Sequence, residues 1–171
     1  MKEGYMTLRD RASIEIKGPD AVRFLNGQVS NQVDRELSGI VVPACLCSLK
    51  GKVEALVWIT QGPSQDSLLV DVESSQLDDV VQRLDRYLIA DDCELEERGD
   101  LAVSHIVSES VPEGGRECWR FGVRGFDLVQ TDEVPDLDPW SEEEVLRSRV
   151  IHGIPDSEHE ISGEEFPSEL G

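Results

Sequence analysis

Two β-rich runs separated by a three-residue turn constrain the fold more than any other feature. The runs are VVPACLCSL at residues 41–49 and VEALVWIT at residues 53–60. The turn between them is KGK, in which Gly51 can adopt the positive φ of a tight hairpin. A second turn at residues 62–67 leads to a third run, LLVDV, at residues 68–72. The simplest prediction is a three-stranded antiparallel meander.

A short helix is predicted over residues 19–28 and a longer one over residues 74–89. The first follows an alternating strand pattern at residues 13–17, and Gly-Pro-Asp separates the two. In the second, leucines and valines recur three and four positions apart, as on one face of an amphipathic helix. Ser75 and Asp78 resemble a capping box at its start. Each helix therefore offers one apolar stripe for packing.

A third helix is predicted over residues 141–151. Ser141 and Glu144 have the spacing and chemistry of a complete capping box. The apolar face of this helix would be supplied by Val145, Val150 and Ile151.

Strand patterns cluster again in the second half of the chain, at residues 93–97, 101–107, 117–123 and 126–131. Because strands and helices cluster rather than alternate, the sequence favours an α+β fold with mostly antiparallel sheets and short helices. A chain of 171 residues suits one domain, 1–171, or two interlocked α+β subdomains at about 1–90 and 91–155. Residues 156–171 are expected to form an acidic segment that leads to a missing C-terminal part.

The charge of the chain disfavours two classes of partner. It has 36 acidic and 16 basic residues, for a net charge of -20. Such a surface repels phosphate backbones and anionic lipids, so neither nucleic acid nor membrane is an expected partner. No apolar run approaches the roughly 20 residues that span a bilayer, and the N-terminus lacks the apolar core of a secretory signal. A cytoplasmic location is the resulting expectation.

The cysteines do not form a recognisable metal or redox motif. They are Cys45, Cys47, Cys93 and Cys118. None lies in Cys-x-x-Cys, and no cysteine–histidine spacing matches a zinc site. Cys45 and Cys47 would share one face of a strand. We interpret all four as buried reduced thiols, with redox or metal roles as the alternative, and we predict no metal site.

The histidines give no clear catalytic signal either. His105 lies in an apolar strand pattern, which is more typical of a half-buried structural histidine than of a catalytic one. His152 and His159 are seven residues apart, a weak spacing for a metal pair. Local motifs therefore do not disclose a reaction.

Four segments, taken in order, resemble a known family. They are IEIKGPDAVRFLNGQVSNQV, SLKGKVEALVWI, LLVDVESSQLDDVVQRLDRYLIADDCELEE, and HGIP followed by FPSELG. Their order and spacing resemble the folate-binding family that includes YgfZ and the glycine-cleavage aminomethyltransferase (T protein). The KGK turn and the third segment look closer to YgfZ. The resemblance spans nearly the whole chain and implies the folate-binding domain of aminomethyltransferases; the Lys-Gly-Cys signature of YgfZ would follow after Gly171.

The resemblance implies a set of folate-binding residues. The candidates are Asn31, Gln28, Glu54 and Asp71. Asn31, Glu54 and the hairpin tips are expected to converge on a central hollow shaped for a flat heterocycle. The chain departs from the aminomethyltransferase pattern at Gln32, where an Asp is usual, and at Ile151, where a Glu binds the pterin. Since isoleucine cannot form the bidentate contact of a carboxylate, another carboxylate must replace it or folate binds weakly or not at all.

Three alternative functions follow, two from the resemblance and one from the acidic charge. The first is a YgfZ-like, non-catalytic module that binds tetrahydrofolate or a related folate and supports assembly or repair of iron–sulfur enzymes. The second is an aminomethyltransferase of the glycine cleavage type, in which Glu54 would be the catalytic carboxylate. The third is an interaction domain without a ligand, whose acidic surface binds a basic protein.

Overall fold

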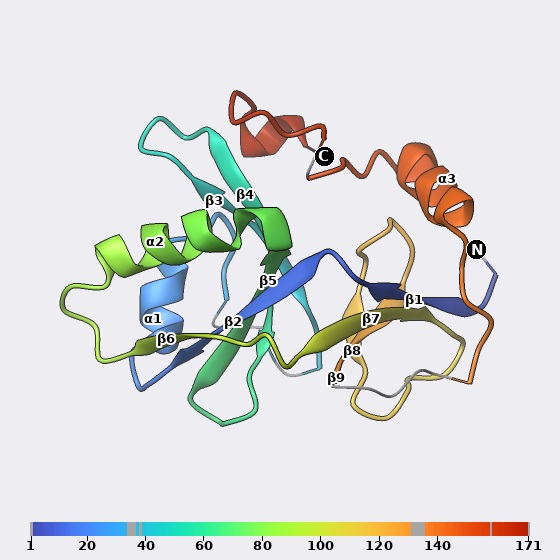
Figure 1. The fold of residues 1–171 in the computed structure, drawn as a ribbon, viewed down its shortest axis with the longest axis horizontal. Coiled ribbons are helices and arrows are strands. Elements are labelled where there is room, and N and C mark those ends of the chain that lie inside the picture. The colour runs from blue at the N-terminus through green and yellow to red at the C-terminus, as the bar shows by residue number, and fades with distance from the viewer. Residues whose placement is uncertain (1, 34–36, 38, 131–135, 158, 171) are drawn as a thin grey trace.

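The computed structural model describes residues 2–33, 37, 39–130, 136–157 and 159–170. The chain forms two antiparallel sheets that lie side by side (Figure 1). The five-stranded sheet has the order β3-β4-β5-β2-β6. Its strands are β2 (Arg11–Lys17), β3 (Val42–Cys47), β4 (Val53–Gln61), β5 (Ser67–Glu73) and β6 (Glu94–Glu97). The predicted meander is β3-β4-β5, and the predicted α+β class with antiparallel sheets is confirmed.

The four-stranded sheet has the order β1-β7-β9-β8. Its strands are β1 (Gly4–Leu8), β7 (Ala102–Val107), β8 (Arg116–Cys118) and β9 (Gly125–Gln130). The chain passes from one sheet to the other twice, between β1 and β2 and between β6 and β7 (Figure 1). Because β1 pairs with β7 and β2 pairs with β6, each sheet takes strands from both ends of this region. The two subdomains near 1–90 and 91–155 remain a prediction.

Two helices cover one face of the five-stranded sheet, α1 (Ala21–Asn26) and α2 (Leu77–Tyr87) (Figure 1). Their buried side chains, among them Leu25 and Leu84, share one apolar core with the strands. Helix α1 is shorter than predicted. The predicted capping box at Ser75 is wrong, because the chain enters α2 through a 3-10 turn, η1 (Ser74–Gln76), and the N-cap residue of α2 makes no side-chain capping bond.

Helix α3 (Glu142–His152) packs against the four-stranded sheet, and its predicted capping box is confirmed. The Ser141 hydroxyl accepts a hydrogen bond from the Glu144 backbone N–H at 3.3 Å, and the Glu144 carboxylate accepts one from the Ser141 N–H at 2.9 Å. Val145 is buried with Phe121 and Trp140. The other two predicted core residues are exposed, Val150 by 72% and Ile151 by 65%, so the predicted apolar face is wrong at both positions.

The chain after α3 runs back over the five-stranded sheet and ends in a 3-10 turn, η2 (Pro167–Glu169). The Val53 N–H donates to the carbonyl of Glu165 at 2.9 Å, which fixes this segment beside the β3–β4 hairpin. None of the helices in the described residues combines the length and the apolar character needed to cross a membrane.

Candidate functional site

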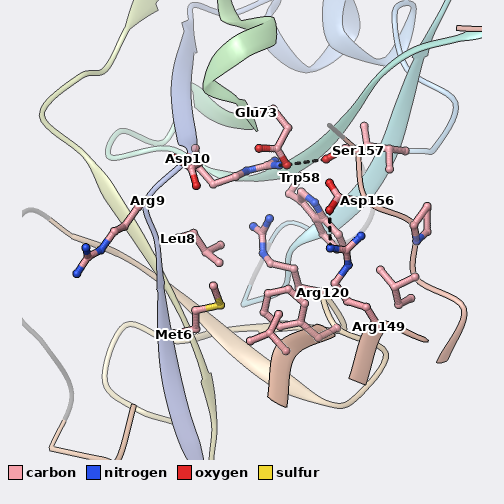
Figure 2. Close-up of a pocket in the computed structure, with 16 residues that line it drawn as sticks. Met6, Leu8, Arg9, Asp10, Trp58, Glu73, Arg120, Arg149, Asp156 and Ser157 are labelled. Atoms are coloured by element: carbon pink, nitrogen blue, oxygen red, sulfur yellow. Dashed lines mark hydrogen bonds and ion pairs between the residues drawn. The ribbon is translucent and has the colours of Figure 1, made fainter. Parts of the chain in front are cut away.

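A cleft of about 230 Å³ opens where the two sheets meet, and we call it the inter-sheet cleft (Figure 2). Its walls come from β1 and the β1–β2 connection, from β4 and β5, from residues 120–121, from α3 and from residues 154–157. Segments far apart in the sequence therefore meet at one opening. Arg120, Trp58 and Arg149 reach toward the same space from different parts of the chain, while Arg9 points away from it (Figure 2).

A buried network of charged side chains joins the sheets behind this cleft. The Arg120 guanidinium donates to Asp71 on β5 at 2.7 Å and to Asp127 on β9 at 2.6 Å. Asp71 also accepts from Arg11 at 3.1 Å, and Asp127 lies 2.7 Å from Nδ1 of His105. Arg120 is only 4% exposed and Asp127 1%. Since unpaired charges are costly to bury, these ion pairs hold the sheets in a fixed relation.

Asp127 and Arg120 stabilise each other's charged form. Burial raises the pKa of the Asp127 carboxyl, but the Arg120 charge and the His105 hydrogen bond outweigh burial and hold that pKa well below its ordinary value. Burial lowers the pKa of Arg120, and the charges of Asp127 and Asp71 more than reverse this, so the guanidinium stays protonated. The Arg120–Asp127 pair is thus ionised at neutral pH.

His105, Cys118 and Asp127 could in principle hold a metal ion, because their ligand atoms lie within 4.8 Å of one another and all three residues are buried. Burial, however, raises the pKa of the Cys118 thiol well above its ordinary value. The Asp127 carboxylate already has Arg120 and His105 as partners. We therefore interpret this group as part of the structural ion-pair network.

Trp58 forms the wall that the inter-sheet cleft shares with a second opening. The Arg120 guanidinium lies 4.5 Å from the centre of the Trp58 ring, a cation–π contact. The second opening, of about 440 Å³, we call the β4 cleft; it is lined by Asn31 and Trp119 among others. The two clefts share Leu56, Trp58, Ile154 and Pro155. The two clefts therefore adjoin each other at Trp58.

The polar groups of the inter-sheet cleft are mostly paired. Glu73 binds Arg11 at 2.6 Å and accepts a hydrogen bond from Ser157 at 2.5 Å. Arg149 binds Asp156 at 2.9 Å. Among the described residues, the Asp10 side chain is the one carboxylate of this cleft without a partner. Asp10 is therefore the acceptor that the cleft offers to a ligand.

The residues predicted to bind folate do not line one cleft. Asn31 lies in the β4 cleft, where its amide donates to the carbonyl of Pro43 at 3.0 Å. Asp71 is buried in the ion-pair network. Gln28 and Glu54 both bind Arg83, at 3.1 and 2.8 Å. Whether any of the four binds folate stays a prediction.

The expected convergence of Asn31 and Glu54 on one hollow is wrong, and an irregularity in β4 explains why. Leu46 pairs with Ala55 and Cys47 pairs with Val53, so Glu54 is an extra residue opposite the β3 strand. Its side chain lines a cleft beside α2, together with Arg83 and Gln76. Ile151, which the resemblance aligns with the pterin-binding Glu, is exposed on α3 and is not among the residues that line the inter-sheet cleft or the β4 cleft.

The sequence motifs did not indicate the residues that form the inter-sheet cleft, above all Trp58, Arg120 and Arg11. A signal existed: Asp71 in LLVDV and Asp127 in FDLV are single carboxylates inside strands that are otherwise apolar. A carboxylate at such a position requires a buried cation as its partner. The sequence does not say which arginine supplies it.

Comparisons with known proteins bear on the fold alone. No protein-family model matches the chain, and no curated protein does. Among solved structures, the chain is similar to the glycine cleavage system aminomethyltransferase T from Bartonella henselae, with a TM-score of 0.60 and 11% sequence identity. The similarity covers 87% of this chain and 44% of that protein.

The chain therefore has the fold of a part of this aminomethyltransferase, as the resemblance in the sequence implied. The chain spans less than half the length of the solved relative that it matches. The closer likeness to YgfZ remains a prediction.

Proposed function

We propose that this chain is a binding module for tetrahydrofolate or a related reduced pterin, and that the ligand occupies the inter-sheet cleft and extends into the β4 cleft. The observation that carries the proposal is the meeting of the two clefts at Trp58. A flat heterocycle can stack on an indole, and drug-sized ligands usually occupy roughly 300–1,000 Å³, more than the inter-sheet cleft provides by itself. The sequence resemblance to the folate-binding family supports the same class of ligand, and the fold shared with an aminomethyltransferase agrees with that resemblance.

Asp10 takes the role that the aminomethyltransferase pattern gives to a pterin-binding Glu. A carboxylate meets the paired N–H donors of the pterin amidine in bidentate fashion. Asp10 lines the inter-sheet cleft, and its carboxylate has no partner among the described residues. It therefore supplies the acceptor that Ile151 cannot.

The test is anaerobic isothermal titration of the whole chain with tetrahydrofolate. We expect binding with a sub-millimolar Kd, weakened at least about tenfold in Asp10→Asn, the loss of one charge-assisted contact. Asp66→Asn is the matched control, because Asp66 is an exposed turn carboxylate that is not among the residues lining either cleft. No heat with sub-millimolar ligand would refute the proposal; equal affinities in the two variants would refute the role of Asp10.

We propose no catalytic step for this chain. The aminomethyltransferase alternative needs Glu54 beside the ligand, whereas Glu54 binds Arg83 in a different cleft. Formation of methylene-tetrahydrofolate from an aminomethyl-lipoyl donor, abolished by Glu54→Gln, would restore that alternative. The role toward iron–sulfur enzymes is supported by the sequence resemblance alone, and loss of activity of such enzymes on deletion of this protein is its test.

A further inference from the structure

Two cysteines line one cleft at the edge of the five-stranded sheet. Cys45 and Cys47 lie on β3, one of the two edge strands of this sheet, and both are free thiols. With Gln28, Arg83 and Tyr87 they line an opening of about 330 Å³, which we call the dithiol cleft. Cys45 is 8% exposed and Cys47 is half-buried, so both sulfurs are sheltered but border an open space.

The spacing of the two thiols suits a bridging ion better than a disulfide. Residues two apart on a strand point to the same face, and their Cα atoms are about 6.6 Å apart. Disulfides rarely join Cα atoms more than about 6.8 Å apart and prefer roughly 5.5–6 Å. A disulfide here would lie at the limit of the usual range, whereas an ion between the sulfurs lengthens the bridge.

A fixed cation lies beside the thiols. The Arg83 guanidinium donates to the Cys47 carbonyl at 2.8 Å and to the Gln28 side chain at 3.1 Å. Burial raises the pKa of the Cys47 thiol, the Arg83 charge opposes that effect, and the Glu54 charge adds to it. The thiols are thus protonated at neutral pH and lose their protons only to a ligand that binds thiolate strongly.

We propose that Cys45 and Cys47 form a two-thiolate site for a soft monovalent cation, Cu(I). Binding breaks two S–H bonds, releases two protons to solvent and forms two Cu–S bonds, without a change in oxidation state. The product carries one negative charge, which the nearby Arg83 stabilises.

Soft thiolate ligands select Cu(I), and the dithiol cleft offers no third cysteine, histidine or carboxylate among its described lining residues. Structural zinc requires four such ligands. This inference does not depend on the proposed folate function.

The test is competition for Cu(I) between the whole chain and bicinchoninate, followed by absorbance under anaerobic conditions. We expect one Cu(I) per chain. Because two protons leave, the apparent affinity should rise by up to about 100-fold per pH unit below the pKa values of the thiols. Cys45→Ser and Cys47→Ser should each lower it by at least about 100-fold.

Matched variants separate this site from general thiol binding. Cys93→Ser should leave the affinity unchanged, because this half-buried thiol is not among the residues that line the dithiol cleft. Arg83→Gln should weaken Cu(I) binding and Glu54→Gln should strengthen it, opposite effects that a loss of folding would not produce. Circular dichroism of the metal-free variants checks that each one folds.

Three outcomes would overturn the inference. The first is an equal loss in Cys93→Ser, which would mean non-specific binding. The second is one Cu(I) per two chains, which would mean that thiols of two molecules share the ion. The third is tighter binding of Zn(II) than of Cu(I), which would mean that ligands beyond the two thiols complete a different site.

Discussion

Replacing Arg120 by methionine removes the guanidinium that pairs with both sheets. Arg120 is 4% exposed, and the substitution leaves Asp127 (1% exposed) and Asp71 (5%) without their shared partner. Breaking a buried ion pair costs about 3–5 kcal/mol. Because Asp71 keeps Arg11 and Asp127 keeps the His105 hydrogen bond, we expect the lower end, about 3 kcal/mol. For a chain of this size that loss lowers Tm by roughly 6–12 °C.

The assay is urea unfolding followed by tryptophan fluorescence and circular dichroism, whose transitions must coincide for the free energies to be compared. The control is Arg124→Met. The Arg124 side chain is 47% exposed and pairs with Glu117 at the surface, so its loss should cost under about 1 kcal/mol.

The pH dependence gives a second test of the same reasoning. In the native chain the pKa of Asp127 is depressed, so its contribution is present above the unfolded pKa of about 4 and is lost as the pH falls below it. Without Arg120, burial raises that pKa, and proton uptake relieves the cost. The stability gap between the Arg120 variant and the native chain should therefore narrow as the pH falls from 7 to 4. Two results would refute the argument. One is a loss of unfolding free energy in Arg120→Met no larger than that in Arg124→Met; the other is a loss in Arg120→Met that does not shrink as the pH falls.

Three further predictions test the structure elsewhere. Leu84→Ala on α2 empties a fully buried position and should cost about 2–5 kcal/mol in urea unfolding. Gly122→Ala should destabilise by at least about 1–2 kcal/mol, since φ is +78° and a Cβ would lie 2.2 Å from the Cβ of His152; faster amide exchange in α3 is the measurement. Asp100 should titrate with a pKa of about 2, and NMR of Arg98→Gln should show it returning toward 3.8, because the Arg98 hydrogen bond causes the shift.

Local features of the fold could be predicted because their causes are local. The β3–β4 hairpin follows from a glycine turn between two β-rich runs, and the turn glycine has φ of +78°. The capping box of α3 needs only Ser141 and Glu144, three residues apart. In both cases the residues that determine the structure lie within a few positions of one another.

Pairing between distant strands could not be predicted in the same way. β1 pairs with β7 in a register that runs from Gly4 opposite Val107 to Leu8 opposite Val103. The local sequence of β1, GYMTL, does not indicate that β7 is its partner. The alternation of apolar and polar residues shows which side chains share one face of a strand, but it does not show which sheet the strand joins. The exposure of Val150 and Ile151 has the same origin, since the direction in which α3 packs is set by the distant sheet rather than by the helix sequence.

The candidate site was predicted least well, because it depends on both long-range pairing and one inserted residue. Gln28, Asn31 and Glu54 come from neighbouring segments of the sequence. Glu54 is nevertheless the inserted residue of β4, and its side chain points toward α2. Periodicity cannot reveal such an insertion, since a shift by one residue moves a side chain to the other face.

The charge of the chain and the charge of the proposed ligand oppose each other. The net charge is -20, and folates carry carboxylates. Arg11 and Arg120 do not compensate, because Asp71, Glu73 and Asp127 already pair with them. Recognition must therefore come from short-range contacts, stacking on Trp58 and hydrogen bonds to Asp10, rather than from long-range attraction. It follows that added salt, which screens the repulsion between chain and ligand, should strengthen folate binding, whereas it would weaken the binding of a basic protein to the same acidic surface.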